Sequence, residues 1–364
     1  MLGDRLKIAR KKAGLSLRAL ADAMDPPVSA QAISKYESGE MMPSSRVLLG
    51  LSQALNVSID FLMGHEVREL AVVEFRKHSG TSARDRSRVE ATVIEALENY
   101  LAVEDILGVP ANTDPFAAIY RDCIANLEEA EALADQLREK WALGVDPIPS
   151  MTKLLEDKGI KVIEADLPEK VSGLTCMVRR NSGKPVVPAI VVARNLNVER
   201  RRFTLAHELA HCIIGRVASS SIRLETAMNR FAGAFLVPAK HLRNEVGPRR
   251  FNIAYQEIIY LKKLYGVSAA AILVRLGATG ILSEAAISYA FRTYANRWRI
   301  EEPEPIGDDE GFGAFERPTK FEGLVYRALA EQLISPIRAA QLLGKSLAEI
   351  KKGIKGPHKQ GHAR

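Results

Sequence analysis

Apolar residues in the first part of the chain recur at helical spacing in five short blocks. Leu17 and Leu20 fall on one face of the second block. The third block begins after Ser29 and ends at Gly39, and both residue types are typical of helix ends. Two short helices joined by a tight turn are the layout of a helix-turn-helix unit. The pattern therefore predicts a five-helix domain over residues 1–64 that contains such a unit.

The pattern changes twice in the middle of the chain. Residues 65–125 are charged and mostly spaced as helices, which predicts a helical connector. From residue 126 onward, predicted helices enclose three β-rich runs, "IKVIEAD", "GLTCMVRR" and "AIVVARN", and the turn-forming "NSGKP" separates the last two. Residues 126–300 are therefore expected to form an α+β domain with a small β-sheet.

The end of the chain begins with an acidic stretch rich in Pro and Gly. This stretch, residues 301–318, predicts a solvated linker. Residues 319–364 then predict two C-terminal helices, the second starting at Ser335 and Pro336, and a disordered basic tail. The apolar faces of the two helices must be buried on the rest of the chain or on a partner chain. As a whole, the chain is expected to be multidomain and mainly α with a small β-sheet.

Composition narrows the class of protein. The 364 residues are 47% hydrophobic, which is enough for the cores of two or three domains. The formal charge of +7 is a mild basic excess that is compatible with nucleic acid. Three cysteines without C-x-x-C spacing argue against a disulfide framework. With no apolar secretion signal and no apolar run near the roughly 18 residues that span a bilayer, we expect a cytoplasmic protein without membrane contact.

The run "FTLAHELAH" carries the clearest chemical pattern. His207 and His211 are four residues apart, so on a helix their side chains lie about 6 Å from each other on one face and can share a cation. Glu208 lies beside the same face, where its carboxylate can act on a water molecule. The alternative is a coincidence within a buried helix. Burying these groups without partners costs several kcal/mol, a cost that metal coordination removes, so the run predicts one zinc ion per chain.

A catalytic zinc ion takes three protein ligands and keeps one position open. Glu225, fourteen residues after His211, is the best candidate for the third ligand. A helix returning across the first would offer Glu225 and Asn229 from one face. The alternative is that Glu225 is an acidic residue favoured near a helix N-terminus by the helix dipole, and spacing alone leaves both possibilities open.

The same stretch resembles a known family. "FTLAHELAH" followed by E-x-x-x-N-x-F-A-x-x-x-L-x-P is similar to the ImmA/IrrE metallopeptidases, over roughly residues 125–305. The resemblance implies a zincin-like domain in which His207, His211 and Glu225 bind zinc and Glu208 is the catalytic base. It also implies a protein substrate of the repressor type. The residue that stabilises the oxyanion stays open among Arg201, Arg202, His241, Tyr260 and Tyr265.

The motif S-x-Q-x-I-S-K-Y-E-x-G resembles the Xre-type repressor domain, over residues 1–64. Gln31 and Lys35 should project from the helix, where Gln can pair with adenine and Lys with guanine or phosphate. Arg18 is placed for a phosphate contact. The alternative is a small helical bundle that makes protein contacts. The candidate DNA contacts are Arg18, Ser29, Gln31, Ser34 and Lys35.

These patterns together predict a homodimeric regulator that binds a double-stranded DNA operator and carries a zinc metalloendopeptidase domain. Its setting would be a stress response, a prophage or a toxin–antitoxin pair. A first alternative is a non-proteolytic transcription factor or antitoxin whose zinc domain is a sensor or partner-binding module. A second is a peptidase whose N-terminal domain only docks its substrate. The C-terminal segment is hypothesised to hold the dimer or a closed peptidase.

Overall fold

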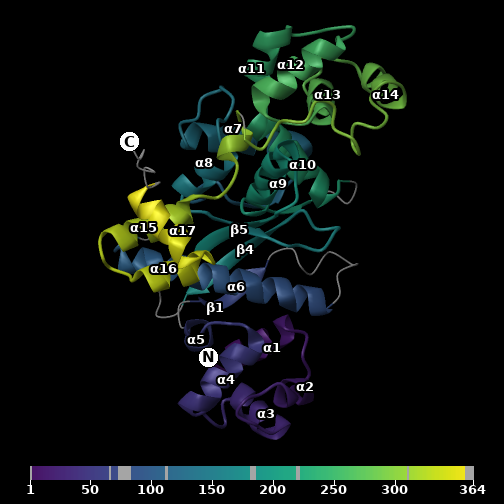
Figure 1. The fold of residues 1–364 in the computed structure, drawn as a ribbon. Coiled ribbons are helices and arrows are strands. Elements are labelled where there is room, and N and C mark those ends of the chain that lie inside the picture. Colours follow the sequence, from purple (N-terminus) through teal and green to yellow (C-terminus); the bar gives the residue numbers. More distant parts are fainter. Residues whose placement is uncertain are drawn as a thin grey trace, which may run out of the picture.

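A computed structural model gives the structure of the protein (Figure 1). The residues that it describes are 2–64, 67–72, 83–110, 114–180, 186–218, 222–309 and 311–356. They form seventeen α-helices and two small β-sheets, which confirms the expectation of a mainly α chain. No helix in these ranges is long and apolar enough to cross a membrane.

The N-terminal domain is the predicted five-helix bundle. Serine hydroxyls accept a backbone N–H three residues ahead at the starts of its second to fifth helices, which explains why these helices begin where they do. Its core is formed by Leu6, Leu20, Ile33, Leu51 and Leu62, which are fully buried or nearly so. The helices are α1 (Leu2–Lys12), α2 (Leu17–Asp22), α3 (Ala30–Ser38), α4 (Ser45–Leu55) and α5 (Ile59–Met63).

The segment after this domain contains a strand, β1 (Val67–Val72), and a long helix, α6 (Ala83–Ile106). The expectation of a purely helical connector is therefore wrong in part. β1 pairs antiparallel with a strand more than a hundred residues away, and local periodicity carries no signal for such a partner. Residues 73–82 lie outside the described residues.

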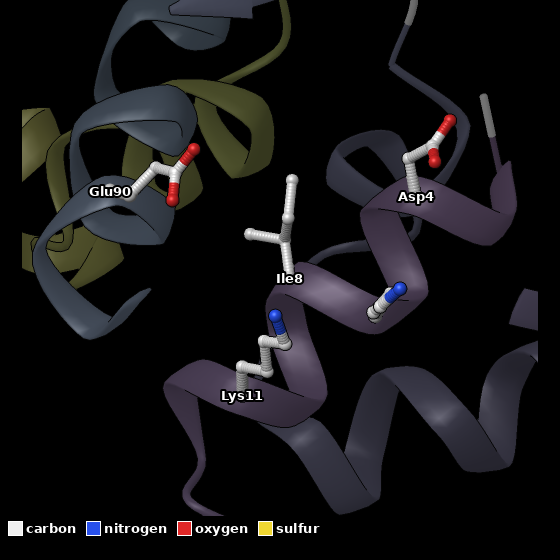
Figure 2. A pocket seen from close by; sticks show the side chains of 5 residues that line it. Asp4, Ile8, Lys11 and Glu90 are labelled. Atoms are coloured by element: carbon white, nitrogen blue, oxygen red, sulfur yellow. The ribbon is translucent and has the colours of Figure 1, made fainter. Parts of the chain in front are cut away.

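Helix α6 carries the N-terminal domain on one side. The buried guanidinium of Arg5 donates to Glu98 on α6 and, at 2.8 Å, to the backbone oxygen of Val67. Lys12 forms a second ion pair with Glu95, and Ile94 of α6 joins the core of the N-terminal domain. A small polar pocket borders this contact and is lined by Asp4, Lys7, Ile8, Lys11 and Glu90 (Figure 2).

The larger sheet has the strand order β1-β4-β5-β3, with β3 (Lys161–Ala165), β4 (Gly173–Arg180) and β5 (Val187–Ala193). β4 is antiparallel to both neighbours, whereas β3 and β5 are parallel. Side chains alternate between the two faces of the sheet. Ala189 and Val191 of β5 share a core with α6, while Ile190 and Val192 share one with α9 (Val198–His211). The sheet thus separates the connector helix from the helix that holds the histidines.

The remaining helices surround α9 and form the largest core of the described chain. A second, two-stranded sheet pairs β2 (Arg121–Ile124) in parallel with β6 (Ile214–Val217). Helix α10 packs against both α7 and α9, and Pro238 follows its end. The helices are α7 (Leu127–Lys140), α8 (Met151–Asp157), α10 (Leu224–Leu236), α11 (Ala239–Val246), α12 (Tyr255–Tyr265), α13 (Ala269–Ala278) and α14 (Glu284–Arg292).

The acidic segment, residues 301–318, is not the solvated linker that its composition predicts. Glu316 has no exposed surface; its carboxylate pairs with Arg202 of α9 and accepts the backbone N–H of Met151 at 2.7 Å. Phe312 lies against the same guanidinium, 4.3 Å from the guanidinium carbon to the ring centre. The segment packs on the α+β domain because the buried Arg202 guanidinium on α9 requires a counter-charge.

Three helices follow where two were predicted: α15 (Lys320–Ala330), α16 (Pro336–Leu343) and α17 (Leu347–Lys355). The predicted disordered tail, which begins at Lys351, overlaps the end of α17, a helix that starts with a capping box between Ser346 and Glu349. Residues 357–364 lie outside the described residues. Much of the apolar surface of these helices is buried on one another and on Val103 of α6, as one of the two expectations had it, whereas Leu333 stays 49% exposed.

The buried pair of Arg202 and Glu316 should contribute strongly to stability. Replacing Glu316 by Ala leaves the buried guanidinium of Arg202 without its counter-charge and the backbone N–H groups of Met151 and Thr152 without their acceptor, and we expect a loss of about 3–5 kcal/mol. Urea unfolding followed by tryptophan fluorescence measures this, since both tryptophans, Trp141 and Trp298, lie in the same domain. The control is Glu331→Ala, which breaks an exposed pair with Arg327 and should cost less than about 1 kcal/mol. Equal losses in the two variants would contradict the expectation.

Candidate functional site

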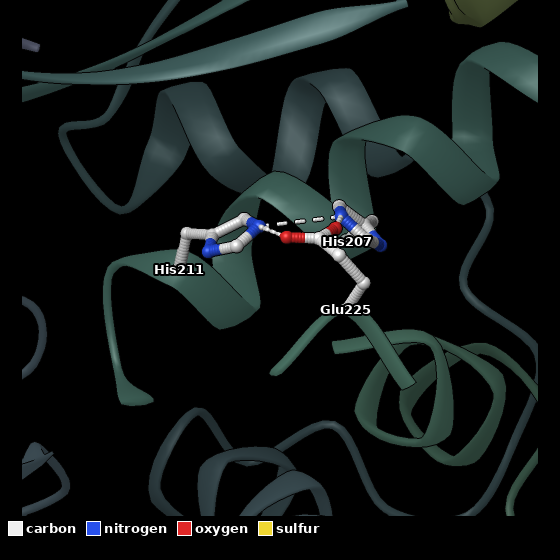
Figure 3. Close-up of side chains that lie close together, drawn as sticks. All are labelled: His207, His211 and Glu225. Carbon is white, nitrogen blue, oxygen red and sulfur yellow. Dashed lines mark hydrogen bonds and ion pairs between the residues drawn. The ribbon is translucent and has the colours of Figure 1, made fainter. Parts of the chain in front are cut away.

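Helices α9 and α10 bring three potential metal ligands together (Figure 3). His207 and His211 lie one turn apart on α9, and α10 packs across it so that Glu225, in its first turn, meets both imidazoles. The distances are 3.2 Å between the two Nε2 atoms and 3.1 Å from His207 Nε2 to Glu225 Oε2. One ligand atom from each residue lies within 4.8 Å of the others.

Asn229 orients the first histidine. It lies one helical turn after Glu225 on α10, and its Oδ1 atom is 2.9 Å from Nδ1 of His207. When Nδ1 donates its proton to this oxygen, the lone pair of Nε2 points toward Glu225 and His211. The sequence pattern of Glu225 and Asn229 on one helix face is thus found in the structure, with Asn229 contacting the histidine ring.

The donor set suits a cation. Two imidazole nitrogens and a carboxylate oxygen converge, and electron-rich atoms at such distances need a proton or a metal ion between them. The pKa of His207 also shows that the site favours a positive charge. Burial, the largest influence, lowers it, but Glu225, Glu208 and Asn229 together raise it above its ordinary value. Glu225 is 53% exposed, so the site opens to solvent on the side of α10.

Strand β4 holds Glu208. This residue is 5% exposed, and the hydroxyl of Thr175 lies 2.8 Å from both its carboxylate Oε2 and its backbone oxygen. Gly173 lets the strand approach: a Cβ atom there would lie 2.6 Å from Thr204 and 3.0 Å from Glu208 Oε1. Sequence reasoning missed both strand residues. They precede the motif by more than thirty positions, and no local pattern links them to it.

The candidate oxyanion residues have other partners. Arg202 is fully buried against Glu316, and Arg201, with 1% of its side chain exposed, donates to the backbone oxygen of Leu196 at 3.1 Å. The hydroxyl of the fully buried Tyr265 lies 2.7 Å from Nδ1 of His241. These burials exclude Arg201, Arg202 and Tyr265 as groups that touch a substrate.

Tyr260 and His241 keep access to solvent. Tyr260 is 56% exposed, and its hydroxyl lies 3.2 Å from Glu245 on α11. His241 is partly buried, and it pairs with Tyr265 as described above. Of the five candidates, Tyr260 and His241 therefore remain.

The predicted DNA contacts are all exposed residues of the N-terminal domain. Ile33 and Tyr36 of α3 are buried, which turns Gln31, Ser34 and Lys35 toward solvent. Arg18, near the start of α2, is also exposed. Ser29 is the N-cap of α3, because its hydroxyl accepts the backbone N–H of Ala32 at 3.1 Å.

Comparison with known families identifies both domains. Residues 6–62 match the family model described as "Helix-turn-helix", and residues 155–277 match the one described as "IrrE N-terminal-like domain". The chain therefore combines an Xre-type helix-turn-helix domain with an IrrE/ImmA-like domain, which confirms the two resemblances in the sequence. The possible metal-binding group of His207, His211 and Glu225 lies inside the second match.

The similar curated proteins are transcriptional regulators of Bacillus subtilis (strain 168). The "SPbeta prophage-derived uncharacterized HTH-type transcriptional regulator YonR" is 40% identical over 63 residues, 17% of this chain and 56% of that protein. The "HTH-type transcriptional regulator ImmR" is 38% identical over 65 residues, 18% of this chain and 50% of that protein. The chain thus spans about half the length of these relatives. No solved structure matches it significantly.

Replacing Glu225 by Ala should release most of the bound zinc, because two histidines alone hold zinc weakly. Wild-type protein dialysed against zinc and then buffer should keep about one ion per chain, measured by mass spectrometry of the metal. Asn229→Ala should weaken binding about 10–100-fold, since it removes the group that orients His207.

The matched control for this series is Glu245→Ala, which removes an exposed carboxylate from α11. That variant should keep the wild-type zinc content. If Glu225→Ala also kept it, the third ligand would have to be a different residue.

Proposed function

We propose that this chain is a DNA-binding transcriptional regulator that carries a zinc metalloendopeptidase domain. In this proposal, residues 1–64 bind DNA, residues 126–300 form the peptidase, and residues 65–125, 301–318 and 319–364 connect and support them. The observation that carries the enzymatic half is the convergence of three ligand atoms within 4.8 Å, beside a glutamate that a strand holds in place.

His207, His211 and Glu225 would hold the zinc ion. When bound, zinc supplies Lewis acidity, which polarises a peptide carbonyl and makes water easier to deprotonate. Glu208 takes the proton of the attacking water and passes it to the leaving amine. The hydroxyl of Thr175 lies 2.8 Å from its Oε2 and its backbone oxygen, which supports this role because the carboxylate is fixed beside the histidines.

The proposed substrate is a repressor-type protein. The match of residues 155–277 to the IrrE-like family and the Xre-type domain at the start of the same chain support this proposal. One curated relative is named as prophage-derived, and this supports a prophage or stress-response setting. The DNA-binding half is proposed to act as a homodimer on an operator inside the cell, because domains of this type contact two half-sites one helical turn apart.

The alternative is a transcription factor whose zinc domain serves as a sensor or partner-binding module without proteolysis. It is favoured by the names of both curated relatives, which describe regulators. The two functions differ in one respect that can be measured, the need for a carboxylate at position 208.

Replacing Glu208 by Gln should abolish proteolysis while zinc and DNA binding remain. The amide keeps the size of the side chain but cannot accept a proton, so we expect the cleavage rate to fall about 10²–10⁴-fold. The assay incubates the zinc-loaded full chain with repressors encoded beside it and follows fragments by mass spectrometry.

The control in the cleavage assay is Glu284→Gln, an exposed glutamate in the first turn of α14, which should cleave like wild type. If wild-type protein with full zinc content cleaved none of the neighbouring repressors, the sensor alternative would replace the peptidase.

Replacing Gln31 by Ala should relax sequence preference at one base pair and cost about 1–3 kcal/mol on the specific site. Lys35→Ala should lower the dependence of affinity on salt by roughly one phosphate contact. Fluorescence anisotropy with the promoter region of the chain's own gene measures both. Gln53→Ala, an exposed glutamine on α4, is the control and should leave both quantities unchanged. Loss of affinity in the control alone would refute the assignment of α3.

A further inference from the structure

The three C-terminal helices repeat the layout of a helix-turn-helix domain. Helix α16 ends at Leu343, and α17 begins at Leu347, so the turn between them has three residues. Gly344 opens this turn with a left-handed backbone (φ 61°), and the hydroxyl of Ser346 accepts the N–H of Glu349 to start α17. Two helices joined by a three-residue turn with glycine are characteristic of this motif.

The packing of these helices fixes which face of α17 is outside. Ala339 of α16 and Ile350 of α17 are fully buried, together with Val325 of α15. Gly353 of α17 lies against α15 so closely that a Cβ atom would be 2.4 Å from the hydroxyl oxygen of Tyr326. The N-terminal domain has the same plan: α2 buries Leu20, and α3, which follows a serine cap, buries Ile33.

The outer face of α17 is cationic. Lys351, Lys352 and Lys355 are exposed, and their ammonium groups have no ion pair within the described chain. The one acidic residue of the helix, Glu349, is engaged by the backbone N–H and hydroxyl of Ser346 at 2.8 and 2.7 Å. Residues 320–355 contain seven basic and three acidic side chains. This charge is complementary to a phosphate backbone.

The C-terminal helices and the N-terminal domain are held by the same helix (Figure 1). Ile94 of α6 lies in the N-terminal core, and Val103 lies in the core of α15–α17, about 13 Å further along the helix axis. Tyr100 also stacks on Phe321 of α15, with ring centres 5.4 Å apart. The two helix-turn-helix units are therefore fixed within one body and not joined by a free tether.

We propose that residues 320–355 form a second DNA-binding module, in which the outer face of α17 contacts double-stranded DNA. The ligand is duplex DNA because a short helix with three lysines on its exposed face, following a helix and a glycine turn, presents charge to phosphates as a recognition helix does. The proposal concerns a surface that the N-terminal domain does not share, so it can fail or succeed independently of Gln31 and Lys35.

The test measures binding of the full chain to a mixed-sequence duplex by fluorescence anisotropy over a range of salt concentrations. The variant is the triple substitution Lys351→Ala, Lys352→Ala and Lys355→Ala. Each lost phosphate contact lowers the slope of log affinity against log salt by about 0.9, so we expect the slope to fall by about one to three. We also expect weaker binding at low salt. The control is Lys153→Ala, Lys170→Ala and Lys240→Ala, which removes the same charge from exposed positions elsewhere.

A second measurement places the helix on DNA directly. Ala348 is exposed at the start of α17, and replacing it by Cys in a Cys123→Ser background allows attachment of a photocrosslinker. We expect crosslinks to the duplex from this position and none from a cysteine at Lys170. Identical salt slopes for both triple variants, without crosslinks from position 348, would overturn the proposal.

Discussion

The structure depends on one constraint, which is that helix α9 crosses the protein interior with charged and polar side chains that must all find partners. Burying an ionised group without a partner costs several kcal/mol, so each of these residues determines what packs beside it. The buried charged or titratable residues of the helix are Glu199, Arg201, Arg202, Glu208 and His211. The residues that pair with these side chains come from strand β4, helices α10 and α12, and the acidic segment.

The buried polar side chains in the two halves of α9 find their partners in different ways. In the first half, Glu199 pairs with Lys262 of α12, and Arg202 pairs with Glu316 of the acidic segment; both pairs are almost completely buried. In the second half, Glu225 remains half exposed beside the histidines. The buried ion pairs fix the position of the first half of the helix. The second half is accessible to solvent, so a substrate can take the place of water there. A helix held rigidly at one end and accessible at the other provides a preorganised site.

Helix α6 holds the larger parts of the described chain together. One side packs under the sheet through Val93, Leu97 and Leu101, and another receives the N-terminal domain through Arg5 and Glu98. Its C-terminal end carries α15–α17. The N-terminal domain, helices α15–α17 and the sheet beside the possible metal-binding group therefore share one support. The sheet in turn contacts Glu208 through Thr175.

The sequence by itself determined the local features. Serine caps and apolar spacing located the helices of the N-terminal domain, and the spacing of His207, Glu208 and His211 placed these side chains near one another on a helix. Such features depend on neighbours three or four residues apart, and the backbone geometry of a helix is the same in every protein. The family resemblance added Glu225, which spacing alone left open.

Only the tertiary structure decided which distant groups complete these features. Thr175 and Gly173 reach Glu208 from a strand, Glu316 neutralises Arg202, and β1 joins a sheet, all across large separations in sequence. The acidic segment shows the reason most clearly. Its composition describes how it behaves alone in water, but its final position follows from the cost of a buried guanidinium elsewhere in the chain. A cost of that kind arises only when the chain is folded, because only then are the two groups removed from water together.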